Sequence, residues 1–406
     1  MRRTLPADPV ATGGGRLRRV PYPRLVANPP DDIYDPDVGH GTTTDVFANR
    51  LRVLSANDFH GYAPSYERIA AGLLADRGLL ERLAPLAHPN HLPVRLFAAV
   101  RYCSLGEPGG PLATTYRTGA GDPWPPFVEL LERRFADVAE LVRTRTIQTN
   151  EVGRSAALLP ALEAAQREIG GPLALLELGS SAGLNLLVDR YRIDYGTGGV
   201  HGDPASPVDL RCTLVGGTAP PRSPGPLSIA SRVGIDVDPV DVTDDDACRW
   251  LEACVWPEPA ERSQRLRAAL GLARRDPPDL RRADALDALG PLVDAVAADA
   301  VPVVETSWVL AYLPREGRRK VHDLLAERGA HRDLALVTAE YPHITSWVPA
   351  PAHPPLDGDP ALTTRLVLTT WRDGRETVRP LAWMHPHGRW LEWLASDDRT
   401  GPVPAR

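Results

Sequence analysis

Lysine is almost absent from this 406-residue chain, because Lys320 is the only lysine among 46 basic residues. A P-loop needs a lysine after its second glycine, and a pyridoxal-phosphate enzyme needs one for its Schiff base. Lys320 lies in GRRKVHDLL, a pattern typical of the basic face of a helix. The sequence therefore argues against both classes of enzyme, and its abundant arginine indicates a biased composition rather than a phosphate-binding surface.

Cysteine and long apolar runs are also scarce. The cysteines at 103, 212, 248 and 254 form no C-x-x-C pair, which favours free thiols over a disulfide scaffold or a zinc site. No run approaches the roughly 20 apolar residues of a membrane span, and residues 1–25 lack an apolar stretch of signal-peptide length. Together with a net charge of −6, these absences predict a cytoplasmic protein that uses no metal and binds neither nucleic acid nor membrane.

The length and the apolar patterns predict two structured domains after an N-terminal arm. Residues 1–40 are rich in Pro, Gly and Arg without apolar periodicity, so we expect a flexible arm. Residues 41–170 repeat apolar residues at helical spacing, as in PFVELLERRFADVAELVRTR, and show no alternating strand. This pattern predicts an all-helical N-terminal domain, in whose last helix Pro160 should cause a bend or a split.

The pattern changes at residue 171, where a second domain, 171–406, is expected to begin. Short apolar runs at 173–178, 231–237, 300–308 and 334–340 alternate with helical or irregular stretches, which predicts a parallel sheet covered on both faces. Residues 363–384 hold a D-G turn between two β-prone runs, which is typical of an antiparallel hairpin. The expected fold class is α/β, with a Rossmann-like, mostly parallel sheet that ends in an antiparallel hairpin, as in class I methyltransferases.

The turn after the first apolar run, in LALLELGSSAGLN, carries the main functional motif. Glu177, Gly179 and Gly183 match the acid-x-Gly-x-Gly-x-Gly motif of methyltransferases, with Ser181 in the place of the middle glycine. Residues 179–183 also satisfy G-x-S-x-G, the nucleophile elbow of serine hydrolases, with Ser181 as the nucleophile. A dinucleotide fingerprint would need three glycines here and finds only one.

The residues after the later apolar runs favour the methyltransferase motif. Asp236 ends the second run, where an acid can accept the ribose hydroxyls of a nucleoside, and Asp284 follows as the acid expected near the adenine amine. The fourth stretch, VPVVETSWVLAYLP, supplies Thr306, Trp308 and Tyr312, which we expect on the substrate side of the site. No HGGG-type oxyanion sequence precedes the turn, as the hydrolase hypothesis would require.

A polar segment, RTRTIQTNEVGR, separates two apolar helices of the N-terminal region. One hypothesis is a polar loop in which Asn150 caps the next helix. The other is a polar wall that faces the cofactor turn and binds substrate or cofactor through Gln148, Asn150, Glu151 and Arg154.

Two insertions interrupt the expected second domain. Residues 191–230 predict a β-rich flap over the ligand cleft. Residues 243–278 predict a helical segment whose Trp250 and Trp256 are more often core residues than a substrate platform.

Several stretches of the chain resemble an uncharacterised bacterial family, the domain of unknown function 2332. They include RTIQTNEVGRSAALLPAL, LLELGSSAGLNLLVDRYRIDYG, RVGIDVDPVDVTD, TSWVLAYLP and HGRWLEWL. The resemblance covers roughly residues 45–396 and implies a methyltransferase-like fold.

These observations lead to the hypothesis of an S-adenosylmethionine-binding protein that methylates a small molecule. The turn 177–183 would bind the cofactor, and the acceptor, if it must lose a proton, would meet Glu340, Tyr341 or His343 after the fifth strand. A serine hydrolase using Ser181 and a non-catalytic protein that keeps the cofactor fold are the alternatives.

Overall fold

The computed structural model describes residues 42–88, 91–223, 225–349, 355–356 and 363–394. The arm expected over residues 1–40 lies outside the described residues. The α-helices are α1 (Thr43–Leu54), α2 (Pro64–Ala75), α3 (Arg77–Leu83), α4 (Leu92–Leu105), α5 (Pro111–Thr118), α6 (Trp124–Arg133), α7 (Phe135–Thr144), α8 (Ser155–Ile169), α9 (Asp245–Cys254), α10 (Ala260–Ala273), α11 (Ala285–Asp294) and α12 (Arg315–Gly329). The strands are β1 (Leu173–Leu178), β2 (Arg192–Asp194), β3 (Val200–Gly202), β4 (Asp209–Arg211), β5 (Thr213–Leu214), β6 (Ile229–Asp236), β7 (Asp279–Arg282), β8 (Val301–Ser307), β9 (Leu334–Glu340), β10 (Thr364–Arg372), β11 (Arg375–Met384) and β12 (Trp390–Trp393).

The protein is a mixed α/β structure built on one large, mostly parallel sheet. Its strand order is β5-β12-β11-β10-β9-β8-β1-β6-β7, and β7, β6, β1, β8 and β9 all run parallel. The chain leaves β1 toward β6 and β7 on one side, and then returns to β8 and β9 on the other. The order therefore reverses between β1 and β8, which makes this point the topological switch of the sheet.

The predicted hairpin is confirmed. β10 and β11 pair antiparallel, and Asp373 and Gly374 between them have φ of 51° and 72°. Two successive positive φ angles are the requirement of a type I′ turn, which matches the right-handed twist of the strands that it joins. The D-G dipeptide thus fixes the register of the antiparallel end of the sheet.

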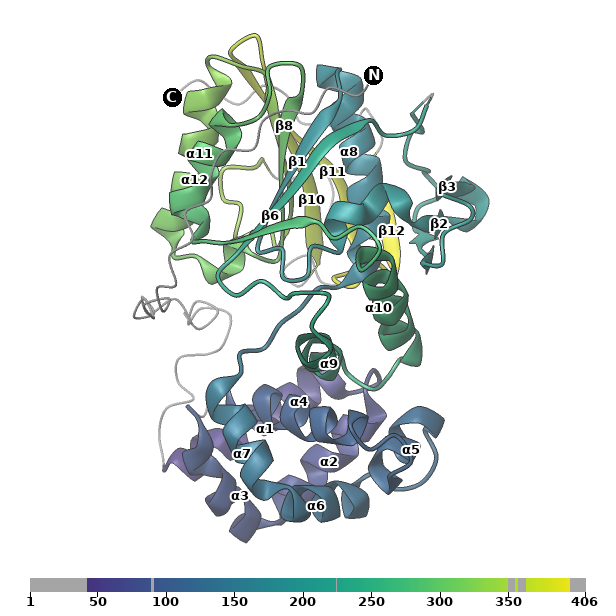
Figure 1. Ribbon diagram of the computed structural model, residues 1–406, viewed down its shortest axis with the longest axis vertical. Helices are drawn as coiled ribbons and strands as arrows, with labels where there is room; N and C mark the ends of the chain where they lie inside the picture. Colours follow the sequence, from purple (N-terminus) through teal and green to yellow (C-terminus); the bar gives the residue numbers. More distant parts are fainter. Residues whose placement is uncertain (1–41, 89–90, 224, 350–354, 357–362, 395–406) are drawn as a thin grey trace, which may run out of the picture.

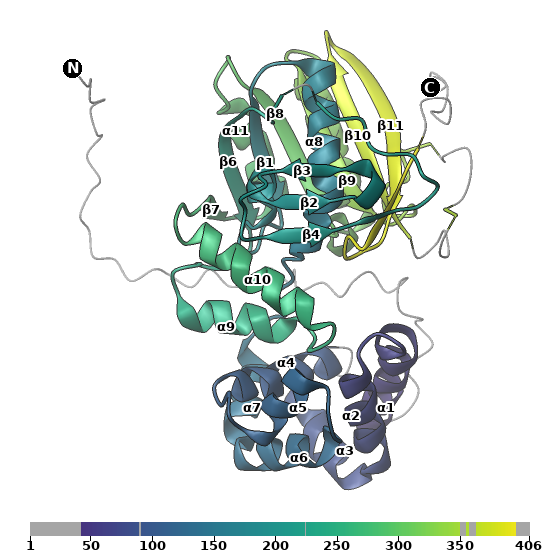
Figure 2. The same cartoon turned by 90° about the vertical axis from the view of Figure 1, so that its right-hand side faces the viewer.

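Helices cover both faces of the sheet (Figure 1). One core packs α8 against one face and also includes side chains of α10, and a second core packs α11 and α12 against the other face. The helices before α8 have a core of their own, and α9 lies between them and the sheet (Figures 1 and 2). No helix in the described part of the chain is both long enough and apolar enough to cross a membrane.

The first helix begins at a cap that its residue types favour. Thr42 and Asp45 form a capping box at the N-terminus of α1, in which each side chain accepts from the other residue's backbone N–H. The long helical segment expected at 126–145 is instead two helices, α6 and α7. Arg134 between them has φ −114° and ψ 25°, outside helical values, and its guanidinium pairs with Asp137 and Glu107.

The insertion 243–278 is helical, as expected, and its tryptophans are core residues. Trp250 of α9 is 3% exposed within the core of the N-terminal helices, and its Nε1 donates to the Thr146 carbonyl at 2.7 Å. Trp256 packs edge-on against Phe59, with ring centroids 5.1 Å apart. The α9 segment thereby joins the N-terminal helices to the sheet.

The insertion 191–230 holds the predicted β-structure, but it does not cover the ends of the parallel strands. Strands β3, β2 and β4 form a small sheet whose buried side chains, Ile193, Tyr195 and Leu210 among them, join the core around α8. The small sheet therefore packs on the outer side of α8 (Figure 2). The expectation of a flap over the cleft is wrong, because its apolar face is buried on a helix instead.

Pro160 lies inside α8, yet the helix continues unbroken from Ser155 to Ile169. A proline has no N–H, so the Ala156 carbonyl loses its partner one turn earlier. The hydroxyl of Tyr195, directly after β2 of the small sheet, donates to that same carbonyl. The proline is tolerated because a tyrosine replaces the missing donor, and the expected split does not occur.

This substitution of donors gives a direct test. Tyr195→Phe should lower the free energy of unfolding by roughly 1–3 kcal/mol, because it leaves the buried Ala156 carbonyl without a donor. Pro160→Ala restores the backbone N–H, so Tyr195→Phe should cost less in a Pro160→Ala background. Denaturant unfolding of the four proteins measures this coupling, and equal costs in both backgrounds would show that the two residues act independently.

Candidate functional site

The turn that follows β1 is held in a constrained conformation. Gly179, Ser181 and Gly183 have φ of 67°, 51° and 66°. A left-handed residue other than glycine costs on the order of 1–3 kcal/mol, and such residues cluster at functional sites. The Ser181 N–H donates to Asp236 Oδ2 at 2.8 Å, so the turn is tied to the carboxyl end of β6.

The two acids expected to contact a nucleoside lie at neighbouring strand ends. Asp236 accepts through Oδ1 from the Asp238 N–H at 2.8 Å, and burial raises the pKa of its carboxyl. Asp284 caps α11 by accepting from the Leu286 N–H at 2.8 Å. The Ala283 N–H, next to Asp284, donates to the Asp236 carbonyl at 3.0 Å. The structure thus brings both acids to one edge of the sheet, where each also satisfies backbone N–H groups.

The chain after the turn does not form an α-helix. Residues Asn185–Arg190 form a 3₁₀ helix, η5, and Leu187 within it has non-helical φ and ψ. Its short length provides no extended row of free N–H groups for an anion. Any ligand of the turn must therefore be recognised by side chains and by the turn itself.

The polar segment before α8 crosses the carboxyl ends of the strands. Asn150 accepts from the Leu184 N–H at 3.0 Å, directly after the turn, and Gln148 donates to the Asp238 carbonyl at 2.9 Å. Asn150 does not cap α8, because the residue that caps the short η4 helix (Val152–Arg154) is Glu151. The segment forms a polar wall beside the turn.

Arg154 ties three parts of this edge together. Its Nε donates to the Pro386 carbonyl at 3.0 Å and its Nη1 to the Ser307 carbonyl at 2.9 Å, while its guanidinium lies 5.3 Å from the Trp308 ring. Burial lowers the pKa of this arginine. The β11–β12 loop can approach because Gly388 has no side chain, since a Cβ there would lie 1.9 Å from the Gly153 carbonyl oxygen.

The residues after β8 and β9 lie together. Glu340 Oε1 accepts from the Val309 and Leu310 N–H groups at 2.8 and 2.9 Å and from the Thr306 hydroxyl at 3.3 Å, and burial raises its pKa. Glu340 therefore fixes the turn that leads into η7 (Leu310–Tyr312). The fold also brings the side chains of Trp308, Tyr341 and His343 into one aromatic row and leaves Tyr312 exposed.

Trp308 is the second strained residue at this edge. Its φ is 62°, and its indole Nε1 donates to the Thr364 hydroxyl at 3.0 Å. Of the three non-glycine residues with positive φ in the described chain, Asp373 belongs to the hairpin turn. The other two, Ser181 and Trp308, both lie at the carboxyl edge of the parallel strands.

Glu305 is a feature of this edge that the sequence analysis missed. In the paired strands Glu177 lies beside Glu305 and also beside Gly234, so the three positions form one row on the α8 face. Ser180 fills the space above Gly234, since a Cβ there would lie 2.5 Å from the Ser180 Oγ. The apolar runs gave no signal for Glu305, because this residue lies inside a run whose other residues are typical of a buried strand.

The carboxyls in this row are buried without sufficient partners. Among the described residues, neither oxygen of Glu305, nor Oε2 of Glu177, nor the hydroxyls of Ser180 and Ser181 have a hydrogen-bond partner. Burial raises the pKa of Glu305 to about 8, and burial together with the charge of Glu305 raises the pKa of Glu177 well above its usual range. Unpaired buried polar groups are expensive, which makes this row a candidate ligand contact.

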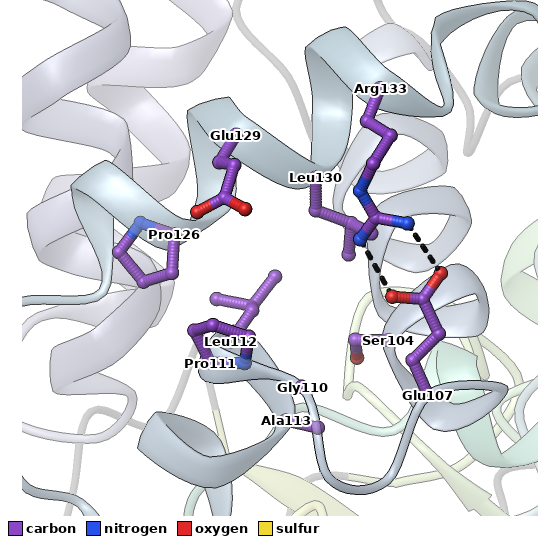
Figure 3. Close-up of a pocket in the computed structure, with 10 residues that line it drawn as sticks. All are labelled: Ser104, Glu107, Gly110, Pro111, Leu112, Ala113, Pro126, Glu129, Leu130 and Arg133. Carbon is purple, nitrogen blue, oxygen red and sulfur yellow. Dashed lines mark hydrogen bonds and ion pairs between the residues drawn. The ribbon is translucent and has the colours of Figure 1, made fainter.

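The small cavity shown in Figure 3 lies elsewhere, among α4, α5 and α6. Its volume of about 10 Å³ is room for about one water molecule. The ion pair between Arg133 and Glu107, 2.7 Å from Nη2 to Oε2, closes one side. This cavity is too small for a cofactor. Across the described residues, no three His, Cys, Asp or Glu side chains are placed to hold a metal ion.

Comparison with known proteins gives one match. A family model described as "Uncharacterized protein conserved in bacteria (DUF2332)" matches residues 48–393. No curated protein and no solved structure matches the chain.

The buried carboxyl pair predicts a specific pH dependence of stability. Glu305 has a higher pKa in the folded protein than the usual 4.5, so it releases its proton later in the folded than in the unfolded chain. The free energy of unfolding should therefore fall as the pH rises from about 4.5 to about 8, by up to about 1.4 kcal/mol per pH unit for one proton.

Glu305→Gln cannot ionise, so it should remove much of this fall and be most stabilising, relative to the wild type, near pH 8. Glu129→Gln on the exposed face of α6 is the matched control. Chemical denaturation of the three proteins at pH 5 and pH 8 makes the comparison. An equal effect of Glu305→Gln at both values would contradict a carboxyl that is neutral in the folded state.

Proposed function

The chain belongs to the DUF2332 family, and we propose from its site that it binds S-adenosylmethionine at the carboxyl edge of the sheet and methylates a small molecule. The proposal is carried by one observation. The strained turn 179–183 lies at the topological switch between β1 and β8, and its Ser181 N–H is held by Asp236 of the neighbouring strand. Open α/β sheets bind their ligands outside the carboxyl ends of the strands at this point.

The side chains at this edge suit the parts of the cofactor. Glu177 Oε2 and the hydroxyls of Ser180 and Ser181 have no hydrogen-bond partner within the described ranges, and they would face the methionine part with its ammonium group. Asp236 would accept the ribose hydroxyls, and Asp284 would lie near the adenine amine. Val237 beside them is 51% exposed and would present an apolar surface to the adenine ring.

The bound cofactor would supply the activated methyl group. The protein's part is then to place the acceptor in line and to exclude water, which requires no acid–base pair in the turn. Thr306 near the end of β8, Trp308 and Tyr312 after it, and the polar wall with Gln148 and Asn150 would line the acceptor side. Glu340 is engaged by two backbone N–H groups, and Tyr341 and His343 beside it are the other proposed bases.

Entry of the cofactor requires one local change. A Cβ on Gly179 would lie 2.5 Å from the Val309 side chain, so Val309 covers the turn. Asp236 likewise uses both oxygens on backbone N–H groups. The segment 308–312 must therefore move away from the turn when the cofactor binds.

The hydrolase alternative finds less support. A serine nucleophile needs a base within hydrogen-bond reach, and it must face the solvent side of the site. Ser181 is 2% exposed, and no histidine in the part of the chain that the structure describes pairs with its Oγ, which has no hydrogen-bond partner there. The His387 ring instead contacts the Tyr62 hydroxyl at 3.0 Å from Nδ1.

Isothermal titration with S-adenosylmethionine and with S-adenosylhomocysteine tests the proposal. The wild type should bind both, and Ser181→Ala should keep binding, because it loses one neutral hydroxyl while Asp236 still holds the backbone N–H of the turn. Asp236→Asn should weaken binding at least about tenfold, the loss of one hydrogen bond to a charged group. Asp238→Asn is the matched control, because Asp238 pairs with exposed Arg282 and should change the affinity less than about threefold.

Thermal unfolding of each variant separates loss of binding from loss of fold. If neither ligand produces heat nor raises the melting temperature of the wild type, the cofactor proposal is wrong. If the wild type hydrolyses a simple ester and Ser181→Ala does not, the hydrolase alternative replaces the methyltransferase proposal. Binding of both ligands with no transfer to any acceptor would support the non-catalytic alternative.

A further inference from the structure

Three arginines converge on one tyrosine beside the proposed cofactor site. Tyr62 precedes α2, Arg262 and Arg265 belong to α10, and Arg389 ends the β11–β12 loop. The guanidinium carbons of Arg389 and Arg262 lie 5.7 and 6.0 Å from the centroid of the Tyr62 ring. We call Arg262, Arg265 and Arg389 the arginine cluster.

One carboxylate lies within the arginine cluster. Glu151 Oε2 accepts from the Nε and Nη2 of Arg262, both at 2.8 Å, and Arg265 Nη2 lies 3.8 Å from Glu151 Oε1. Burial raises the pKa of Glu151, but the charges of Arg262 and its other neighbours outweigh that effect and lower it to about 2. Glu151 is therefore ionised and compensates one of the three guanidinium groups.

The remaining positive charge has no counterpart in the described residues. No other carboxylate there pairs with a member of the arginine cluster, and the buried Nε of Arg265 has no hydrogen-bond partner. Burial and the charge of Arg262 lower the pKa of His387 well below its usual range, so its ring adds no charge at neutral pH. An ion pair that only joined the Glu151 segment to α10 would need one arginine. The arginine cluster has three, so two guanidinium charges are in excess.

The arginine cluster adjoins the acceptor side of the proposed site. Glu151 follows Asn150, which accepts from the Leu184 N–H directly after the turn. Three residues later, Arg154 donates to the Ser307 carbonyl at the end of β8. A molecule bound by the arginine cluster would thus lie close to the strand ends where β8 meets the turn.

We propose that the arginine cluster binds the anionic group, a carboxylate or a phosphate, of this protein's small-molecule substrate. Guanidinium groups recognise both anions through paired, charge-assisted N–H···O bonds. The identification of that molecule as the methyl acceptor rests on the proposed function. The existence of the anion site does not depend on it.

Titration with inorganic phosphate and with succinate at low ionic strength tests the site. The wild type should bind at least one of them, and Arg265→Gln and Arg389→Gln should each weaken binding about tenfold or more. These two variants leave the buried pair of Arg262 with Glu151 intact, so they should still fold. Arg375→Gln, at an exposed arginine of β11, is the control and should bind as the wild type does.

The outcomes separate the claims. Tighter binding of phosphate assigns a phosphate ester, and tighter binding of succinate assigns a carboxylate. No binding of either anion, or binding that both variants leave unchanged, overturns the proposal. Titration of the same wild-type protein with S-adenosylmethionine is the independent readout. If the anions bind and the cofactor does not, only the proposed function fails. If the cofactor binds and the anions do not, only the anion site fails.

Discussion

The charge of Glu151 inside the protein is the constraint on which the meeting of helices and sheet depends. A carboxylate that is 6% exposed is tolerated only where cations and N–H donors compensate it. Arg262 of α10 and the Gly153 N–H do so, and the close backbone contact of Gly153 with Gly388 brings the β11–β12 loop to the same point. The polar wall, α10 and the end of the antiparallel strands are therefore positioned by one buried charge.

Local patterns predicted the centre of the fold well. The runs at 173–178 and 334–340 coincide with β1 and β9, and the D-G turn and the capping box of α1 lie where their residue types require. The patterns missed β7, whose DLRR sequence forms a short, exposed edge strand without apolar residues on both faces. They also predicted one helix in place of α6 and α7. The break lies at Arg134, whose ion pairs with Glu107 and Asp137 do not alter the spacing of the apolar residues.

The candidate site was predictable only where it follows a strand in the sequence. Asp236 and the turn with Ser181 were found because strand ends are visible as the ends of apolar runs. Glu305 was missed because it lies within a strand, and Tyr62 and Arg389 were missed because the fold brings them together across more than 300 residues. Pairings of that kind depend on the tertiary structure, and a single sequence contains no local signal for them.

The hydrogen bond from Tyr195 to the Ala156 carbonyl has a consequence for the way the protein unfolds. The first turn of α8 completes its hydrogen bonding only when the small sheet of β2, β3 and β4 is docked on it. Opening of the small sheet exposes that carbonyl next to a proline that cannot replace the bond. Helix and small sheet therefore form one cooperative unit of local unfolding, and amide protons of both should exchange with solvent at similar free energies.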